Sequence, residues 1–183
     1  KFGGTTAVAA FSIVMYVDQI IGMLNFGIVD SLQPAISYCY GVGLLDRMKA
    51  IFKRVLAATV TTSLVAFLFM LIVGPYAARI FVKPGDTELL AMSITAVRIF
   101  AFSYLVGWID MCFSSYFTAL DQPNRSIVVS VFGTVAFPVF FLFVLTGIFG
   151  LNGVWLMPTV AGLASGILTL TLAKTMKLQS REP

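Results

Sequence analysis

Five stretches of the chain are each long and apolar enough to cross a lipid bilayer, and no other feature constrains the fold as strongly. They cover approximately residues 5–40, 55–77, 89–120, 127–149 and 154–173. A spanning helix needs about 20 mainly apolar residues, whereas the strands of a membrane barrel are about ten residues long and alternate in polarity. The stretches therefore predict an all-α, polytopic transmembrane helix bundle that occupies residues 1–183.

The composition agrees with lipid as the solvent and argues against an enzyme. The 183 residues are 59% hydrophobic and 11% charged, whereas a soluble domain carries about 25% charged residues. Histidine is absent, and the sequence contains no P-loop, zinc-ligand spacing or nucleophile elbow. We expect no enzymatic activity and no cofactor, so any pumping must use an ion gradient or a partner ATPase.

The distribution of basic residues predicts the orientation. Eight lie on one side of the predicted spans: Arg47, Lys49, Lys53, Arg54, Arg125, Lys174, Lys177 and Arg181. Three lie on the other side: Lys1, Arg79 and Lys83. The positive-inside rule places the richer side in the cytoplasm, so the net charge of +4 reports topology and no nucleic-acid partner. Because the first residues look like a loop between spans, we expect the chain to be part of a longer protein.

Asp110 is the most informative polar residue within the spans. Ser103, Gly107, Asp110, Ser114 and Thr118 follow one another at steps of three or four residues, which puts them on one face of a helix. A carboxylate on such a face can bind a cation or carry a proton. The alternative is a carboxyl group that only ties neighbouring helices together.

Two further charged residues lie within predicted spans. Asp18 shares a helix face with Gly22 and Asn25, and it could join a cation or substrate site or pair with a neighbouring helix. Arg98 has a stem long enough to reach the membrane interface, and we expect that role or pairing with an acid. Asp30, near the end of the first stretch, is predicted to be structural.

Prolines and glycines mark local features of the last two spans. Pro138 in the middle of the fourth span predicts a kink, because proline frees a backbone carbonyl. Gly162 and Gly166 form a small-xxx-small pair in the fifth span, which predicts a face for close approach of another helix.

The sequence resembles the multidrug and toxic compound extrusion (MATE) transporters over nearly its whole length. The most specific segment is residues 27–41, which contains Gln33 and Pro34 and is followed by Arg47 and Lys49. It resembles the end of the eighth helix of that family and the following loop. Residues 7–13, 114–120 and 150–155 resemble the start of the eighth helix, the end of the tenth and the beginning of the twelfth.

The resemblance implies one partial lobe of a two-lobe, twelve-helix transporter, namely helices eight to twelve, with the N-terminal lobe as a partner within the same chain. It implies multidrug efflux, with amphipathic substrates exchanged for sodium ions or protons. Sodium-coupled members carry an acid in helix ten, which corresponds to Asp110, so a sodium ion could bind there. We expect a multi-pass protein of the cell membrane, in the bacterial inner membrane.

Three other functions fit the same outline. One is a channel, which would carry currents well above the turnover of a transporter. A flippase for lipid-linked oligosaccharides, from the same broad superfamily, would want several cationic residues facing the cavity for a pyrophosphate, whereas only Arg98 lies within a span. A membrane scaffold without transport activity would have no need of Asp110.

Overall fold

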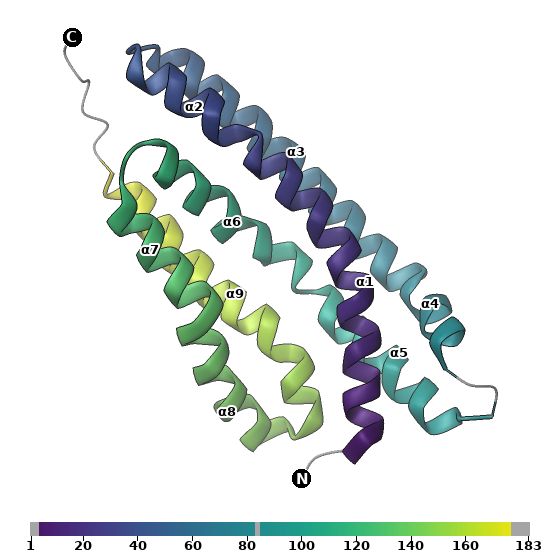
Figure 1. Cartoon of the computed structure of the whole chain (residues 1–183). Helices are drawn as coiled ribbons and strands as arrows, with labels where there is room; N and C mark the ends of the chain where they lie inside the picture. The colour runs from purple at the N-terminus through teal and green to yellow at the C-terminus, as the bar shows by residue number, and fades with distance from the viewer. Residues whose placement is uncertain (1–3, 83–84, 177–183) are drawn as a thin grey trace.

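The computed structural model describes residues 4–82 and 85–176, and these ranges form helices joined by short turns (Figure 1). No strand occurs in them, which confirms the all-α prediction. Lys1, Lys83, Lys177 and Arg181, which entered the count of basic residues, lie outside the described residues.

The helices form two outer layers with a bent pair between them (Figure 1). One layer contains α1 (Gly4–Asp30), α2 (Leu32–Gly41) and α3 (Leu45–Ile72). The other contains α7 (Pro123–Val131), the π-helical segment η1 (Phe132–Ala136), α8 (Phe137–Phe149) and α9 (Leu151–Lys174). The bent pair is α5 (Thr87–Ala101) and α6 (Tyr104–Ala119), and α4 (Gly74–Phe81) connects α3 to it. Helix α6 contacts α2, α3, α7 and α9, so its residues can face both layers.

Four of the described helices, counted across short breaks, are long and apolar enough to cross a membrane. They cover Val8–Gly41, Leu45–Ile72, Pro123–Phe149 and Leu151–Lys174. The bent pair α5 and α6 adds a fifth span if its two helices cross together.

The second span differs from the sequence-based expectation at both ends. The span was expected to begin near residue 55, but α3 already begins at Leu45. A search for long apolar stretches detects only the part of a helix that lipid surrounds. The first turns of α3 extend beyond that part, and they are held in place because Phe52 stacks on Tyr116 of α6 with ring centroids 4.1 Å apart. At the other end, α3 stops at Ile72, and Pro75 lies in the first turn of α4.

The third span is broken, although residues 89–120 were expected to form one helix. Helices α5 and α6 meet at an angle of 48°. At the break, the backbone N–H of Ser103 donates to the carbonyl of Phe100, and that of Leu105 donates to Phe102. These three-residue hydrogen bonds tighten the turn and redirect the chain without proline or glycine.

The fourth span contains the distortion predicted from Pro138, but the distortion is a π-helical segment. This segment, η1, ends two residues before Pro138. Proline has no N–H to donate to the carbonyl of Thr134, and its ring would clash with that carbonyl in a regular helix. The wider π turn accommodates the ring, and such segments are frequent at functional sites.

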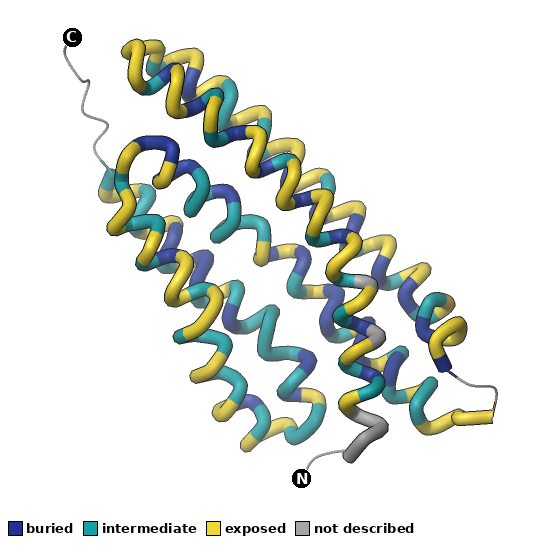
Figure 2. Tube along the Cα trace, viewed as in Figure 1, coloured by how far each residue is buried: buried dark blue, intermediate teal, exposed yellow. Residues whose placement is uncertain are grey.

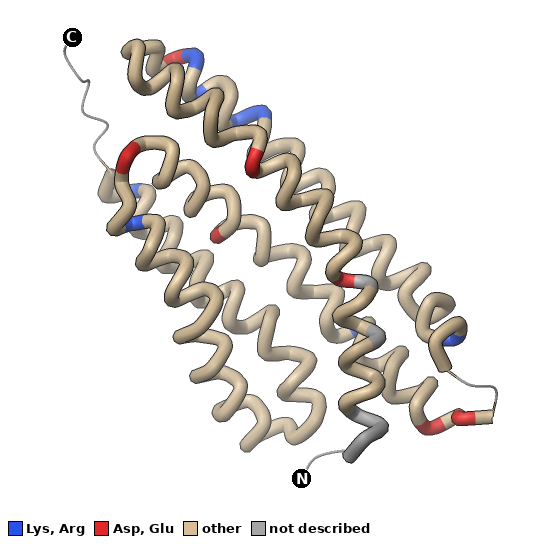
Figure 3. Tube along the Cα trace, in the orientation of Figure 1, with Lys and Arg blue, Asp and Glu red and all other residues tan. Residues whose placement is uncertain are grey.

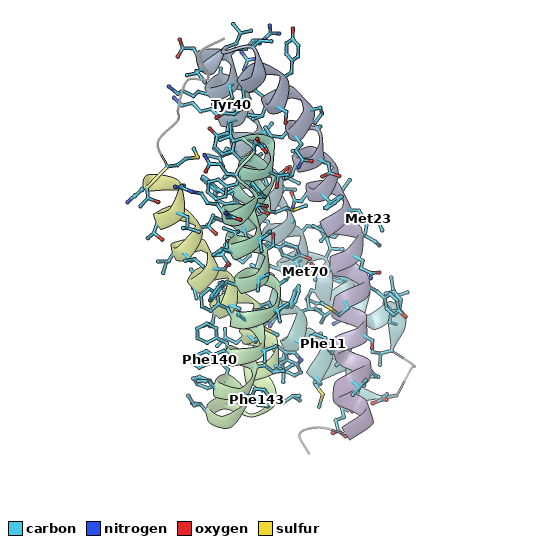
Figure 4. The ribbon with its side chains drawn as sticks, turned by 60° about the vertical axis from the view of Figure 1, so that its left-hand side comes forward. Phe11, Met23, Tyr40, Met70, Phe140 and Phe143 are labelled. Carbon is cyan, nitrogen blue, oxygen red and sulfur yellow. The ribbon has the colours of Figure 1, made fainter. Side chains whose placement is uncertain are left out.

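Exposed residues lie along the outer sides of the helices (Figure 2). Many of them are large and apolar, as lipid contact requires. Met23 and Phe143 are both 74% exposed, and with Phe140 they project outward from the ribbon (Figure 4). Buried apolar residues form one cluster around Phe100 and Trp155 and another around Ile36 and Phe117. The two clusters hold the layers together on either side of the middle of α6.

Basic residues gather at the end where α2 meets α3 and where α7 begins (Figure 3). Arg125 joins α7 to the end of α9 there, because its guanidinium donates to the carbonyl of Leu172 at 2.6 Å. Arg79 lies on α4, towards the opposite end. The described residues thus keep the charge asymmetry from which the positive-inside rule predicts a cytoplasmic location for this basic end.

The close-approach face predicted from Gly162 and Gly166 is confirmed, and its neighbour is α6. A Cβ atom on Gly162 would lie 2.8 Å from Cγ2 of Val106, and one on Gly166 would lie 3.2 Å from Cδ1 of Ile109. Absence of side chains at these two positions therefore lets α9 approach α6 closely.

We predict that Gly162→Leu lowers the thermal unfolding midpoint of the purified full-length protein, because overpacking a tight interface costs about 1–3 kcal/mol. Gly147→Leu is the matched control, since a Cβ there meets no heavy atom within 4 Å. Differential scanning fluorimetry in detergent measures both. Equal midpoints for the two variants would contradict the packing of α9 on α6.

Candidate functional site

The Asp110 carboxylate lies half-buried where α6 faces α9. The hydroxyl of Thr169 donates a hydrogen bond of 2.7 Å to its Oδ1 atom. Ser165 lies one turn earlier on the same face of α9 and is fully buried, and its hydroxyl group lies beside the same carboxylate. Two hydroxyl groups of α9, four residues apart, thus accompany the carboxyl group of α6.

The π-helical segment approaches this carboxylate through a glycine. A Cβ atom on Gly133 would lie 2.9 Å from Oγ of Ser165 and 3.0 Å from Oδ2 of Asp110. Both oxygens therefore face the backbone of η1, and a side chain at position 133 would have to displace one of them. Three spans meet at the carboxylate: the one ending in α6, the one containing η1, and α9.

A cavity of about 690 Å³ opens beside Asp110 and is bounded by four spans. Its apolar wall includes Phe26, Met111 and Met157, together with Pro138 and Pro158. Its polar wall consists of Asp30, Gln33, Asp110, Ser114, Ser115, Thr118, Ser130 and Thr134. The described residues around this cavity include two carboxyl groups and no lysine or arginine.

Hydroxyl groups join α6 to α7 along one side of the cavity. Oγ of Ser114 lies 2.9 Å from Oγ of Ser126 and 2.9 Å from Oγ of Ser130. Thr118 continues the series, with its Oγ1 atom 2.8 Å from Oγ of Ser126. Thr134 donates to the carbonyl of Ser130. We call the hydrogen-bonded set Thr118, Ser126, Ser114 and Ser130 the hydroxyl row.

Asp18 lies apart from this cavity and has its own partner. The phenol of Tyr104 donates a hydrogen bond of 2.8 Å to Oδ1 of Asp18. Tyr104 is the first residue of α6, directly after the break, so this bond ties α1 to the point where the third span bends. Asp18 of α1 is thus bonded to the first residue of α6, whereas Asp110 lies near the middle of α6 and is bonded to α9.

Other residues singled out from the sequence have more peripheral positions. Ser103 lies in the break between α5 and α6 and does not line the cavity. Arg98 is exposed on α5 and makes no ion pair within the described part of the chain. Gln33 lines the cavity, and Pro34 is exposed in the first turn of α2. Asp30, predicted to be structural, lines the cavity as well.

No cluster of three or more histidine, cysteine or acidic residues that could hold a metal ion is present in residues 4–82 and 85–176. A cation at Asp110 would rely on a single carboxylate with the hydroxyl oxygens of Thr169 and Ser165. Such hard oxygen donors suit a proton or an alkali cation.

Sequence reasoning missed Gly133, Ser165 and Thr169. Ser165 and Thr169 carry a recognisable signal, since they are hydroxyl residues at helical spacing within an otherwise apolar span. Gly133 gives no such signal, because glycines are common in spanning helices. Ser126 and Ser130 follow the same four-residue spacing and were also overlooked.

The family model MatE matches residues 1–144. Among curated proteins, the chain is 26% identical over 184 residues to the multidrug export protein MepA of Staphylococcus saprophyticus, a match that covers 98% of the chain and 40% of the relative. It is 26% identical over 152 residues to MepA of Staphylococcus haemolyticus, covering 82% of the chain and 32% of the relative. The chain thus spans less than half the length of these relatives.

Solved structures share the fold. One is described as the outward-facing conformation of a multidrug resistance MATE family transporter of the MOP superfamily, with a TM-score of 0.86 and 17% identity. Another is a MOP superfamily transporter from Pyrococcus furiosus, whose binding pocket is described as having reverse polarity. It has a TM-score of 0.85 and 16% identity. Each match covers 94% of the chain and 39% of the solved chain.

We predict that Gly133→Ala destabilises the full-length protein by about 1–3 kcal/mol, because the new methyl group displaces Ser165 or Asp110. Gly22→Ala is the control, since a Cβ there meets no heavy atom within 4 Å. Adding Ser165→Ala to Gly133→Ala should restore part of the loss, and the double-mutant cycle measures this coupling. Strict additivity of the two changes would contradict the contact.

Proposed function

The chain belongs to the MatE family, and from this premise we propose that the full-length protein is a secondary transporter that exports amphipathic drugs or organic cations in exchange for sodium ions or protons. The chain would supply part of one lobe, and the remaining helices of the protein would supply the rest. The bacterial origin of the MepA relatives supports a location in the bacterial inner membrane.

The observation that carries this proposal is the position of Asp110. Its carboxyl group borders a cavity of about 690 Å³ that lies between spans and is large enough for a small molecule. An ionisable residue within a spanning segment is a functional candidate by default, because the membrane makes it costly. Here the cost is offset by Thr169 and by contact with the cavity.

The walls of the cavity suit an amphipathic cation. Phe26, Met111 and Met157 offer apolar surface, and methionine repacks easily around ligands of different shapes. Asp110 and Asp30 supply negative charge on the other side. A positively charged substrate and a coupling ion would compete for the same carboxylate.

Competition of this kind is sufficient for exchange. Transporters built from repeated halves alternate access by rocking one half against the other around a site near the middle of the membrane. A ligand shifts such an equilibrium only by its difference in affinity for the two states. Net export follows if the bound ion favours one state and the bound substrate favours the other.

A flippase for pyrophosphate-linked lipids is less well supported. Its substrate is anionic and would require several cationic side chains, whereas the described lining of the cavity carries none. Arg98 is exposed on α5 and lies outside the lining.

We predict that Asp110→Asn abolishes gradient-driven drug transport by the full-length protein in proteoliposomes, because the amide cannot exchange a proton or balance a sodium ion. Separate sodium and proton gradients identify the coupling ion. Asp18→Asn is the matched comparison, and it should retain transport, since an amide oxygen still accepts the hydrogen bond from Tyr104. Unimpaired gradient-driven transport in Asp110→Asn would refute the proposed role.

A further inference from the structure

The hydroxyl row reaches from the cytoplasmic end of α6 to the part of the cavity that Asp110 borders. Thr118 is exposed and lies one residue before the end of α6, close to the turn that leads into α7. Ser114 lies one helical turn further in, and Asp110 lies one turn beyond Ser114 on the same face. Ser126 is half-buried between Thr118 and Ser114 and bridges their hydroxyl groups.

The distances in the row match continuous hydrogen bonding between hydroxyl groups. The three oxygen pairs are separated by 2.8, 2.9 and 2.9 Å, which is the usual spacing of an O–H···O bond. In each pair either hydroxyl can be the donor. The hydroxyl groups of Thr118 and Ser126 can also donate to the backbone carbonyl of Ser114, so their protons have two alternative acceptors. A serine or threonine hydroxyl donates one proton and accepts others, so the row can be polarised in either direction.

We propose that the hydroxyl row is a proton path that connects the cytoplasmic end of α6 with the Asp110 carboxylate. This inference rests on the proposed function, in which Asp110 exchanges a coupling ion for substrate. Each hydroxyl accepts a proton from its neighbour and passes on its own, so that no hydroxyl becomes charged overall. The proton enters at Thr118 and passes along the row to Ser114. A water molecule in the cavity that Ser114 and Asp110 both line then carries it over the last helical turn to Asp110.

The physical need for such a path comes from the substrate. An amphipathic drug that occupies the cavity displaces most of the water from it, and a proton must still reach Asp110 for ion and drug to exchange. Fixed hydroxyl groups shorten the distance that water has to bridge to one helical turn, from Ser114 to Asp110. The hydroxyl row is bonded between protein groups of α6 and α7, so it persists when the cavity is occupied. Hydroxyl groups that are hydrogen-bonded to each other at these distances can transfer a proton, but they leave no space for a larger cation to pass.

Interhelical hydroxyl bonds also stabilise packing in membranes, so the test must separate a proton path from a purely structural role. Ser126→Ala removes the bridge between Thr118 and Ser114 and leaves the cavity lining unchanged, because Ser126 is not part of it. Ser126→Thr retains a hydroxyl group at the same position. Thr171→Val is the control, since that hydroxyl bonds only to a carbonyl of its own helix.

The full-length protein in liposomes is assayed in two ways: drug transport driven by a pH gradient, and drug-for-drug exchange without a gradient, which needs no proton transfer. Ser126→Ala should slow gradient-driven transport by roughly tenfold or more, as expected for loss of a positioned proton-transfer group, and leave exchange unchanged. Ser126→Thr should restore the gradient-driven rate, and Thr171→Val should behave as wild type.

Three results would overturn the proton path. Wild-type rates in Ser126→Ala would mean that water in the cavity carries the proton. A parallel fall of gradient-driven transport and exchange would mean that the row is only structural, as would failure of Ser126→Thr to restore the rate. Coupling to sodium alone would remove the need for a proton path. Asp110→Asn, measured alongside, keeps the two proposals distinct, because retained coupling in that variant refutes the role of Asp110 itself.

Discussion

The hydrogen bond between Thr169 and the Asp110 carboxylate joins the central helix of the bundle to α9 at 2.7 Å, and the rest of the site is arranged around it. Gly162 and Gly166 let α9 approach α6 closely enough for that bond to form. Gly133 gives the π-helical segment room beside the same carboxylate. Exchanging any of these small residues for larger ones would move the acid away from its partners, so the charge within the membrane depends on tight backbone packing nearby.

The same arrangement leaves space on one side of Asp110. Apolar clusters close the bundle on either side of the middle of α6, around Trp155 and around Phe117. Between them, the π-helical segment before Pro138 lines a cavity instead of packing against a core. A carboxyl group that is held on one side and open on the other can release and rebind a cation, which a fully enclosed one cannot. The hydroxyl row lies at the edge of this opening.

The apolar stretches were sufficient to predict the all-α membrane fold, because a lipid solvent permits few alternatives. Helical spacing also brought Asp110, Ser114 and Thr118 together, and all three line one cavity. Ser103, expected on the same face, is separated from it by the 48° break, which neither proline nor glycine announces. Thr169 and Ser165 could not be assigned to Asp110 from spacing, because contacts between distant segments depend on how whole helices pack. Asp18 had no partner in the sequence, and its bond to Tyr104 depends on the same packing.

In the proposed mechanism, ion and substrate compete for one carboxyl group, and ion release on substrate binding measures this competition most directly. A cationic drug is added to the purified full-length protein in weakly buffered detergent solution, and released protons or sodium ions are recorded with a pH or sodium electrode. We expect release from the wild-type protein and none from Asp110→Asn. Drug binding without release from the wild type, or equal release from both proteins, would contradict the claim.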